Sequence, residues 1–188
     1  MSHIPFADPV RARDFSAVAH GSQTYNDEVP YVRHTEFVVA VLQRFGFNEP
    51  ELVCAGHLHD AIEDTKTSYN DINDRFGVKV AELVYSVTSE QGRNRKERNA
   101  KTYPKIARRF YPTALKLADR IANVEYGNAT GGKVDMYRKE YPGFRGALWT
   151  DTQWVNKFDC DIAPGSSDMR VARMWAHLDM LLGSTLGG

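Results

Sequence analysis

Apolar residues recur every three or four positions along most of this chain, which is the spacing of one face of an α-helix. Leu115, Ala118 and Ala122, for example, fall on one such face. No stretch alternates apolar and polar residues with the period of two that a half-buried strand shows. The pattern therefore predicts an all-α protein. The predicted helices span residues 9–20, 31–45, 49–61, 68–76, 78–88, 112–124, 134–148 and 168–182, and a further helix follows a charged loop from residue 90 and ends near residue 109.

Residues that start or stop helices stand where the apolar pattern breaks. Asp8 followed by Pro9 is typical of a helix start, and Gly46 and Gly77 are typical of helix ends. Pro142 predicts an interruption or a bend within the helix that contains it. The predicted loops, which are polar, rich in glycine or without a clear pattern, are residues 21–30, 127–132 and 149–167.

The length of the chain predicts one domain. A chain of 188 residues can bury one sizeable core, whereas two cores would need more residues. Its 42% of hydrophobic and 26% of charged residues are typical of a globular protein. We expect a single domain over residues 1–188, with a core at about 8–126, a C-terminal helical extension at about 127–183 and a frayed tail at 184–188.

The charge balance argues against two classes of protein. There are 24 basic and 24 acidic side chains, whereas nucleic-acid coat proteins and polybasic membrane binders usually carry an excess of positive charge. Two cysteines do not make a disulfide framework, and the N-terminus lacks the basic-then-apolar layout of a signal peptide. No apolar run approaches the ~18 residues of a membrane span. We therefore expect a cytoplasmic protein that binds neither nucleic acid nor membrane.

An adjacent His-Asp pair, His59-Asp60, ends an otherwise apolar segment. Burying a carboxylate without a partner is costly. A divalent cation removes that cost, because neutral imidazole and ionised carboxylate are both good ligands for it. Glu63 follows His59 by four residues and Asp64 follows Asp60 by four, so a helix would place all four side chains at one end. The alternative interpretation is that the pair caps a helix and binds no ion.

Two more polar residues stand within apolar-patterned segments. Asp119 lies beside the apolar stripe of its predicted helix, and Asn123 follows one helical turn later. His34 stands near the start of another predicted helix. Each residue alone could be structural, Asp119 as the partner of a base such as Arg120 and His34 as a buried histidine. Together with the His-Asp pair they form a candidate metal-ligand set.

These segments resemble the HD superfamily of metal-dependent phosphohydrolases, and more closely its SpoT-type branch of alarmone hydrolases. The resemblance covers roughly residues 10–126 and follows the family's order and spacing. It implies an all-α HD-domain helical bundle. The matching segments are Ala19-His20-Gly21-Ser22-Gln23 with Pro30-Tyr31-Val32-Arg33-His34, then His59-Asp60-Ala61-Ile62-Glu63-Asp64-Thr65, Phe76-Gly77 through Val84-Tyr85-Ser86-Val87-Thr88, and Lys116-Leu117-Ala118-Asp119-Arg120-Ile121-Ala122-Asn123.

The resemblance also implies a metal centre and an activity. It implies one Mn²⁺, which two imidazoles and two carboxylates would also permit, with another divalent ion as the alternative. It implies removal of pyrophosphate from the 3′ position of a (p)ppGpp-like alarmone. Glu63 and Asp64 would orient or deprotonate the attacking water, and Asn123 would hold the substrate sugar or a water network. The implied metal ligands are His34, His59, Asp60 and Asp119.

The positions that contact the base differ from the family's usual pattern. Tyr25 and Asn26 stand where the alarmone hydrolases usually carry an Arg-Lys pair, and Ser89 and Glu125 stand where a lysine and an arginine are common. Tyr25 could stack on a base, and nearby basic residues could bind phosphate, although the basic run after residue 92 could equally be a solvated helix face. The expected substrate-binding residues are Tyr25, Arg93, Arg95, Lys96, Lys101, Lys116 and Arg120.

The sequence leaves two other functions open. The first keeps the metal ligands and changes the nucleotide, as in a nucleotidase, a deoxynucleoside triphosphate triphosphohydrolase or an NADPH phosphatase. The second is a nucleotide-binding or protein-binding regulator without turnover. For the enzymes the expected partner is a small-molecule nucleotide. The sequence leaves homo-oligomerisation open.

Overall fold

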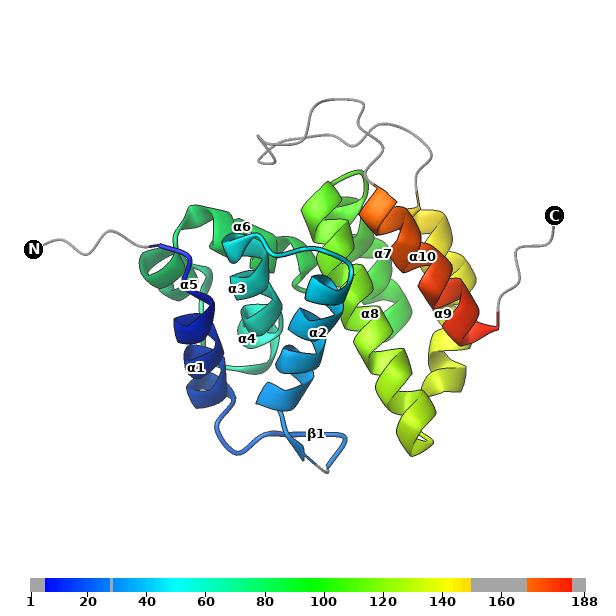
Figure 1. Cartoon of the computed structure of the whole chain (residues 1–188), viewed down its shortest axis with the longest axis horizontal. Coiled ribbons are helices and arrows are strands. Elements are labelled where there is room, and N and C mark those ends of the chain that lie inside the picture. The colour runs from blue at the N-terminus through cyan, green and yellow to red at the C-terminus, as the bar shows by residue number, and fades with distance from the viewer. Residues whose placement is uncertain (1–5, 28, 150–168, 184–188) are drawn as a thin grey trace, which may run out of the picture.

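The computed structural model describes residues 6–27, 29–149 and 169–183, and within them the chain is a bundle of helices with one small hairpin (Figure 1). The helices are α1 (Pro9–His20), α2 (Val32–Arg44), α3 (Pro50–Leu58), α4 (Ala61–Asp64), α5 (Tyr69–Phe76), α6 (Val78–Val87), α7 (Arg95–Ile106), α8 (Phe110–Thr130), α9 (Val134–Leu148) and α10 (Met169–Leu182). The strands β1 (Thr24–Tyr25) and β2 (Val29–Pro30) pair antiparallel, with Thr24 opposite Pro30. The predicted helical class is confirmed, and the hairpin lies inside a segment predicted as a loop.

Local signals in the sequence account for the starts of two helices. The Asp8 carboxylate accepts hydrogen bonds from the backbone N–H groups of Val10 and Arg11, which caps α1. Ser68 and Asp71 form a reciprocal capping box at the start of α5. Both helices begin where the sequence predicts a start.

The helix predicted over residues 49–61 is instead two helices, α3 and α4, with a break at His59 and Asp60. The Nδ1–H group of His59 donates to the carbonyl oxygen of Gly56 (2.9 Å). A side chain that bonds to the backbone in this way competes with the helical hydrogen-bond pattern. The prediction of one continuous helix is therefore wrong, and His59 and Asp60 lie in the junction between two helices.

Helix α8 is longer than the sequence pattern predicts. It begins at Phe110 and continues to Thr130, through most of a glycine-rich segment that we expected to be a loop. Gly127 allows α9 to approach closely, since a Cβ atom there would lie 2.8 Å from the Cγ2 atom of Val134. The helix ends at Gly131, which adopts the left-handed conformation (φ 75°). Packing against α9, which no local pattern reveals, favours the longer helix.

Helix α9 is continuous across Pro142, where the sequence predicts an interruption or a bend. Phe144 and Leu148 are buried after the proline and hold the helix against the core. Such packing stabilises helices more than residue propensity does. The last predicted helix is confirmed as α10. The expected loop after residue 149 and the expected tail at 184–188 lie outside the described residues.

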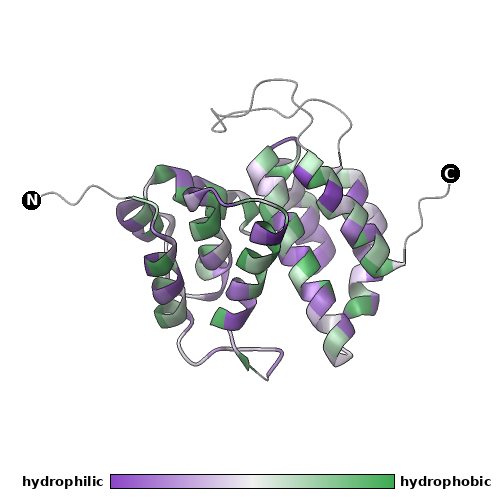
Figure 2. Ribbon diagram, in the orientation of Figure 1, coloured by the Kyte–Doolittle hydropathy of each residue, from purple (hydrophilic) through white to green (hydrophobic). Residues whose placement is uncertain are grey.

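Helix α8 lies at the centre of the bundle. It contacts α2 on one side, and α9 and α10 on another (Figure 1). Leu42 of α2, Ile121 of α8 and Trp175 of α10 are fully buried in one continuous core. Figure 2 shows hydrophobic and hydrophilic residues interspersed along the helices, as expected of helices that bury one face. In the described ranges, no helix combines the length and the apolar character needed to cross a membrane.

Candidate metal centre

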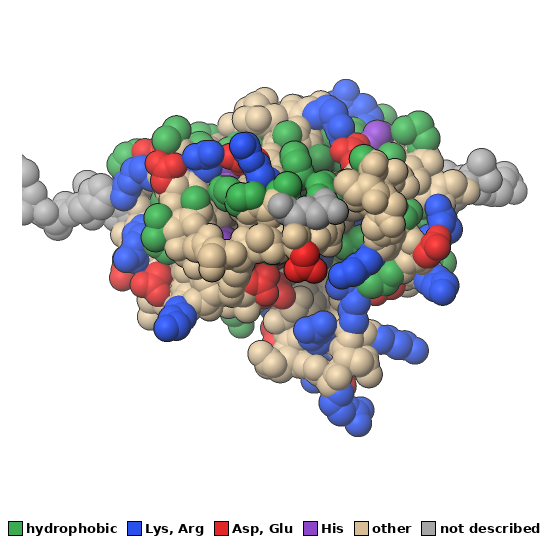
Figure 3. All heavy atoms as spheres, turned by 90° about the horizontal axis from the view of Figure 1, so that it is seen from below, with side chains coloured by type: hydrophobic (Ala, Val, Ile, Leu, Met, Phe, Trp, Pro, Cys, Tyr) green, Lys and Arg blue, Asp and Glu red, His purple; other side chains and the backbone are tan. Residues whose placement is uncertain are grey.

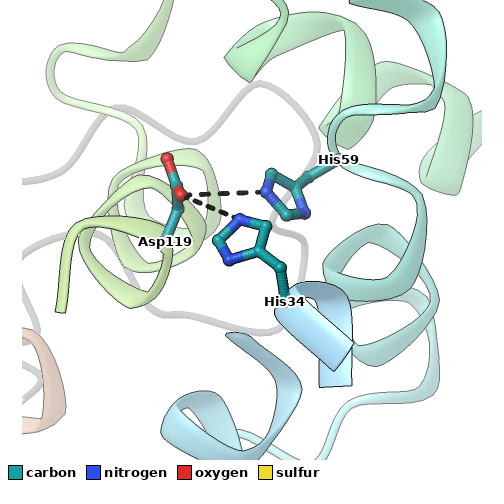
Figure 4. Close-up of side chains that lie close together, drawn as sticks. All are labelled: His34, His59 and Asp119. Carbon is teal, nitrogen blue, oxygen red and sulfur yellow. Dashed lines mark ion pairs between the residues drawn. The ribbon is translucent and has the colours of Figure 1, made fainter. Parts of the chain in front are cut away.

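All four predicted metal ligands meet where α2, α8 and the α3–α4 junction come together. His34 lies in the first turn of α2, His59 and Asp60 lie in the junction, and Asp119 lies midway along α8. The Nε2 atom of His34 is 3.4 Å from Asp119 Oδ1, and that of His59 is 3.8 Å from the same oxygen. Figure 4 shows these two imidazoles and this carboxylate pointing toward one another. One ligand atom from each of the three lies within 4.8 Å of the other two.

The Asp60 carboxylate completes the group. Its Oδ2 atom is 3.1 Å from His59 Nε2 and 3.6 Å from His34 Nε2. The imidazoles are buried, whereas the side chains of Asp60 and Asp119 are 18% and 15% exposed. The group therefore opens to solvent on the side of its carboxylates.

The tautomer of His59 leaves its Nε2 atom free to bind a cation. The Nδ1 atom faces the Gly56 carbonyl oxygen, which can only accept a hydrogen bond, so Nδ1 carries the proton. The Nε2 atom is buried without a hydrogen-bond partner among the described residues, and it faces carboxylate oxygens that are also electron-rich. A positive charge between these atoms would offset the repulsion between the nitrogen lone pair and the carboxylate oxygens. The residues therefore fit a divalent metal ion.

The electrostatics of the group favour a positive charge close to its carboxylates. Burial by itself would lower the pKa of His59, but Asp60 and Asp119 outweigh it and raise the pKa to about 9. Burial by itself would raise the pKa of Asp119, but Lys116 and the two histidines hold it well below its usual value. The site thus favours ionised carboxylates and a positive charge beside them, which a proton on His59 or a bound cation would supply.

Two side chains of α8 orient the Asp119 carboxylate. The Lys116 ammonium donates to Oδ2 (3.0 Å), and the Asn123 amide donates to Oδ1 (2.6 Å). Asn123 also donates to the backbone carbonyl oxygen of Asp119 (2.8 Å). The sequence predicts Lys116 as a phosphate contact and Asn123 as a contact to the sugar or to water. The structure gives both a direct contact with a predicted metal ligand.

Tyr31 is a component of the site that sequence reasoning did not single out. Its hydroxyl donates to Asp60 Oδ2 (2.6 Å) and lies 3.1 Å from Asp64 Oδ2. Its ring stacks on His20, with the ring centroids 4.3 Å apart. The available signal is its place in the Pro-Tyr segment, three residues before His34. Tyr31 therefore joins two of the acidic residues across the site.

Glu63 and Asp64 lie on α4 at the exposed rim of the group. Glu63 Oε1 accepts a hydrogen bond from the backbone N–H of Ser89 (2.7 Å). Crowding that removes water from these carboxyl groups, together with the negative charge of Asp60, raises the pKa of both. Two carboxyl groups with fixed neighbours are thus present at the solvent side of the site.

The predicted phosphate-binding residues around α7 lie on an exposed surface. Arg93 and Lys101 both pair with Glu97, at 3.0 and 3.1 Å, and Lys96 is exposed on the same helix. Figure 3 looks onto the hairpin face of the molecule and shows Lys and Arg side chains gathered on a lobe that projects from one edge. The ion pairs of Arg93 and Lys101 are therefore local, as on a solvated helix face.

Arg95 and Arg120, which we also expected to bind substrate, share the carboxylate of Glu140. Arg95 Nε is 2.6 Å from Glu140 Oε1, and Arg120 Nη1 is 3.3 Å from Glu140 Oε2. Arg120 is buried, and its guanidinium lies over the Tyr137 ring, 4.7 Å from the centroid. This network joins α7, α8 and α9 beside Asp119 and gives both arginines a structural role.

Tyr25 is buried against the predicted metal ligands. Only 8% of this residue is exposed, and its ring stacks on that of His34 with the ring centroids 4.6 Å apart. Its hydroxyl donates to Asn123 Oδ1 (2.8 Å). Stacking on a substrate base would require an open ring face, and this arrangement does not provide one. The expected base contact is therefore not supported.

A family comparison covers most of the chain. The sequence profile of the HD domain family matches residues 12–140. The matched range includes all four predicted metal ligands, the two acidic residues of α4 and the hairpin, and it ends within α9.

Related proteins are guanosine-3′,5′-bis(diphosphate) 3′-pyrophosphohydrolases. That of Aquifex aeolicus is 37% identical over an alignment of 134 residues, which covers 66% of this chain and 19% of the relative. Those of Danio rerio and Drosophila melanogaster are each 30% identical, over 59% and 66% of this chain and 64% and 72% of the relatives. The chain thus spans about a fifth of the bacterial relative and about two thirds of the animal ones.

Solved structures share the fold. One, described as a metazoan orthologue of SpoT that hydrolyses ppGpp, superposes with a TM-score of 0.73 at 22% identity, over 97% of this chain and 99% of that one. A protein of Listeria monocytogenes superposes with a TM-score of 0.59 at 26% identity, over 82% of this chain and 96% of that one. The helical arrangement is therefore one that other proteins adopt across nearly their whole length.

Proposed function

Because this chain belongs to the HD domain family, we propose that it is a metal-dependent phosphohydrolase that removes pyrophosphate from the 3′ position of a (p)ppGpp-like nucleotide. Relatives named for this activity are 30–37% identical to it. The proposed cofactor is one Mn²⁺, to which two imidazoles and two carboxylates are suited. Its proposed ligands are His34, His59, Asp60 and Asp119.

The observation that carries the proposal is the meeting of two imidazoles and two carboxylates from three separate parts of the chain. The Nε2 atoms of His34 and His59 lie 3.1–3.8 Å from oxygens of Asp60 and Asp119. The buried Nε2 atom of His59 makes no hydrogen bond with the described residues, although Asp60 Oδ2 lies 3.1 Å away. An ion between these atoms gives each of them a favourable contact.

Each part of the site has its own proposed role in the reaction. A divalent ion held by His34, His59, Asp60 and Asp119 would supply Lewis-acid chemistry for the phosphoryl group and for the attacking water. Glu63 and Asp64 orient the attacking water and take its proton, because they are the carboxyl groups at the solvent side. The water oxygen bonds to the phosphorus next to the 3′ oxygen, and the bond between that phosphorus and the 3′ oxygen breaks. The 3′ oxygen takes up a proton, and pyrophosphate leaves.

Lys116 is the predicted cation that lies nearest to the ligands. Burial by itself would lower the pKa of its ammonium, but Asp119 and Asp60 raise it, so the charge is permanent. A permanent ammonium group 3.0 Å from Asp119 Oδ2 can also donate to a phosphoryl oxygen of the substrate. We assign Lys116 this second contact.

Product analysis tests the proposed reaction. The purified protein with Mn²⁺ should convert ppGpp to GDP and pyrophosphate. Asp119→Asn should lower the rate by about 10³-fold, because it removes several kcal/mol of electrostatic stabilisation. The matched control is Asp135→Asn, which changes an exposed carboxylate of α9 that pairs with Arg138. Circular dichroism establishes that both variants fold, and wild-type turnover by Asp119→Asn protein would contradict the proposal.

The buried position of Tyr25 favours a second candidate, hydrolysis of another nucleotide at the same centre. The same assay distinguishes the substrates by their products. A nucleoside monophosphate or NADPH yields orthophosphate, a deoxynucleoside triphosphate yields triphosphate, and an alarmone yields pyrophosphate. Binding of these nucleotides without any metal-dependent product would instead identify a regulator.

A further inference from the structure

We propose that Tyr25 is a positioning residue of the metal centre, which orients His34 by ring stacking and Asp119 through Asn123. The inference rests on the proposed function, because it takes His34 and Asp119 to be metal ligands. It also replaces the role that the sequence predicts for Tyr25, which is contact with the substrate base.

The ring of Tyr25 covers the imidazole of His34. The two rings are nearly parallel, with centroids 4.6 Å apart and planes 12° apart, and Tyr126 meets the Tyr25 ring edge-on at 4.8 Å. Rotation of an imidazole about its last side-chain bond is only weakly restricted by itself. A ring packed flat on it restricts that rotation and keeps Nε2 directed at Asp119 Oδ1, 3.4 Å away.

His34 needs such a restraint because it lacks the one that His59 has. The Nδ1 atom of His59 donates to a backbone carbonyl oxygen, which sets both its tautomer and its orientation. The Nδ1 atom of His34 is buried and has no hydrogen-bond partner among the residues that the structure describes. Stacking on Tyr25 therefore takes the place of the usual hydrogen bond behind a metal-binding histidine.

The hydroxyl of Tyr25 acts on the second ligand. The Asn123 amide nitrogen donates to two oxygens of Asp119, one in the backbone and one in the side chain. This fixes the amide so that its oxygen faces Tyr25, whose hydroxyl donates to it (2.8 Å). Tyr25 therefore contacts His34 with its ring and is linked to Asp119 Oδ1 through the amide group of Asn123.

The hairpin is the element that places this side chain. The backbone N–H of Tyr31 donates to the carbonyl oxygen of Gln23 (3.0 Å), which closes the hairpin directly before α2. Asn26 and Asp27 both adopt left-handed backbone conformations (φ 51° and 61°), which Asn and Asp tolerate better than other residues with side chains. The chain can therefore reverse direction right after Tyr25 and point its ring inward.

Mn²⁺ titration calorimetry on single variants tests the two contacts separately. Tyr25→Phe keeps the ring and removes the hydroxyl, and it should weaken Mn²⁺ binding about tenfold, the lower end of what loss of such an outer contact costs. Tyr25→Leu removes the stacking as well and should weaken binding about 100-fold. The control is Tyr69→Phe, which removes a tyrosine hydroxyl that bonds to Glu82 on α6 and should leave Mn²⁺ affinity unchanged.

A double-mutant cycle tests the path through Asn123. Tyr25→Phe should weaken Mn²⁺ binding no further in an Asn123→Ala background, because the hydroxyl then has no amide to orient. At saturating Mn²⁺, Tyr25→Phe should lower kcat and leave KM unchanged. A residue that contacts the substrate base would instead raise KM and leave Mn²⁺ affinity unchanged, and that result would overturn the inference. Additive effects of Tyr25→Phe and Asn123→Ala would overturn the path through Asn123.

The outcomes separate this inference from the proposed function. Absence of Mn²⁺ binding by the wild-type protein would count against the proposed metal centre itself. If the wild type binds Mn²⁺ and both Tyr25→Phe and Tyr25→Leu bind it with the same affinity, only the role of Tyr25 is overturned. Thermal unfolding of each variant without metal shows whether the bundle remains intact, and Tyr25→Phe retains the buried ring that the core requires.

Discussion

The positive charge of Lys116 lies where metal binding and substrate binding place opposite demands on the site. Its ammonium contacts Asp119 and is also attracted by the negative charges of Asp60 and Glu63. This charge favours a phosphorylated substrate, which is anionic, and disfavours a divalent cation beside the same carboxylates. In the proposed site, this one side chain would thus lower metal affinity and support substrate binding.

Lys116→Met should change the two affinities in opposite directions. Mn²⁺ should bind about tenfold more tightly, because repulsion between the ammonium and the ion is removed. The value of kcat/KM should fall about tenfold to 100-fold, because charge-assisted hydrogen bonds to phosphate are lost. Calorimetry and steady-state kinetics measure the two effects. Lys79→Met, on an exposed pair with Glu51, is the control, and weaker Mn²⁺ binding by Lys116→Met would contradict the prediction.

Cys54 illustrates how burial controls reactivity. The thiol is fully buried in α3, and burial raises its pKa to about 12. Only the thiolate reacts with disulfide reagents. In a Cys160→Ser variant, native protein at pH 8 should therefore react about 10³-fold more slowly than the same protein in urea. The native rate should rise about tenfold per pH unit from pH 7 to 9, and equal rates in buffer and urea would show that the thiol is accessible.

Helices α2 and α3 set the separation of the two imidazoles. His34 lies in the first turn of α2 and His59 directly follows α3, and these two helices pack closely at Gly56. A Cβ atom on Gly56 would lie 2.9 Å from Val39 Cγ2 and 3.1 Å from Leu42 Cδ1. The absence of a side chain at this position is therefore a requirement of both the packing and the site.

Gly56→Ala should reduce stability and metal affinity together. Overpacking between α2 and α3 should lower the free energy of unfolding by about 1–3 kcal/mol, and moving His34 away from His59 should weaken Mn²⁺ binding. Urea unfolding and calorimetry measure these effects. Gly146→Ala is the matched control, because its Cβ atom would have no neighbour within 4 Å and should raise helix stability by up to about 1 kcal/mol. A Gly56→Ala protein as stable as the wild type would show that the helices can separate freely.

At the scale of the whole molecule, the proposed ion joins parts of the bundle that are distant in sequence. Its ligands lie in α2, in the α3–α4 junction and in α8, and α8 also packs against α10. An ion that binds only the folded arrangement stabilises all of these elements at once. Metal binding and global unfolding are therefore expected to be linked.

Mn²⁺ at about 100 times its dissociation constant should raise the unfolding free energy by about 3 kcal/mol, and the unfolding midpoint by about 5–10 °C. Differential scanning calorimetry with and without Mn²⁺ measures the shift, and a chelator should reverse it. Asp119→Asn should abolish the shift while Asp135→Asn retains it. An equal shift in Asp119→Asn would mean that Mn²⁺ binds elsewhere on the protein.

Much of the fold follows from residues that are close together in the chain. Apolar periodicity predicts most of the helices, and Asp8 and Ser68 mark starts that the structure confirms. The predictions fail where a contact that the apolar and capping patterns do not reveal outweighs the preference of the residues. Helix α8 continues through Gly127 because α9 packs there. Helix α3 ends before His59, whose ring donates a hydrogen bond to the backbone of that helix.

The sequence by itself indicated candidate residues for the site, because a His-Asp pair and a lone aspartate within apolar helices are unfavourable without a shared partner, and a family resemblance implied the full ligand set. Only the tertiary structure decided how these residues are held. The contacts of Tyr25 with His34 and Asn123, and of Tyr31 with Asp60, join a hairpin and the start of α2 to helices far along the chain. Neither periodicity nor helix signals carry that information, because such contacts depend on how separate elements pack in space.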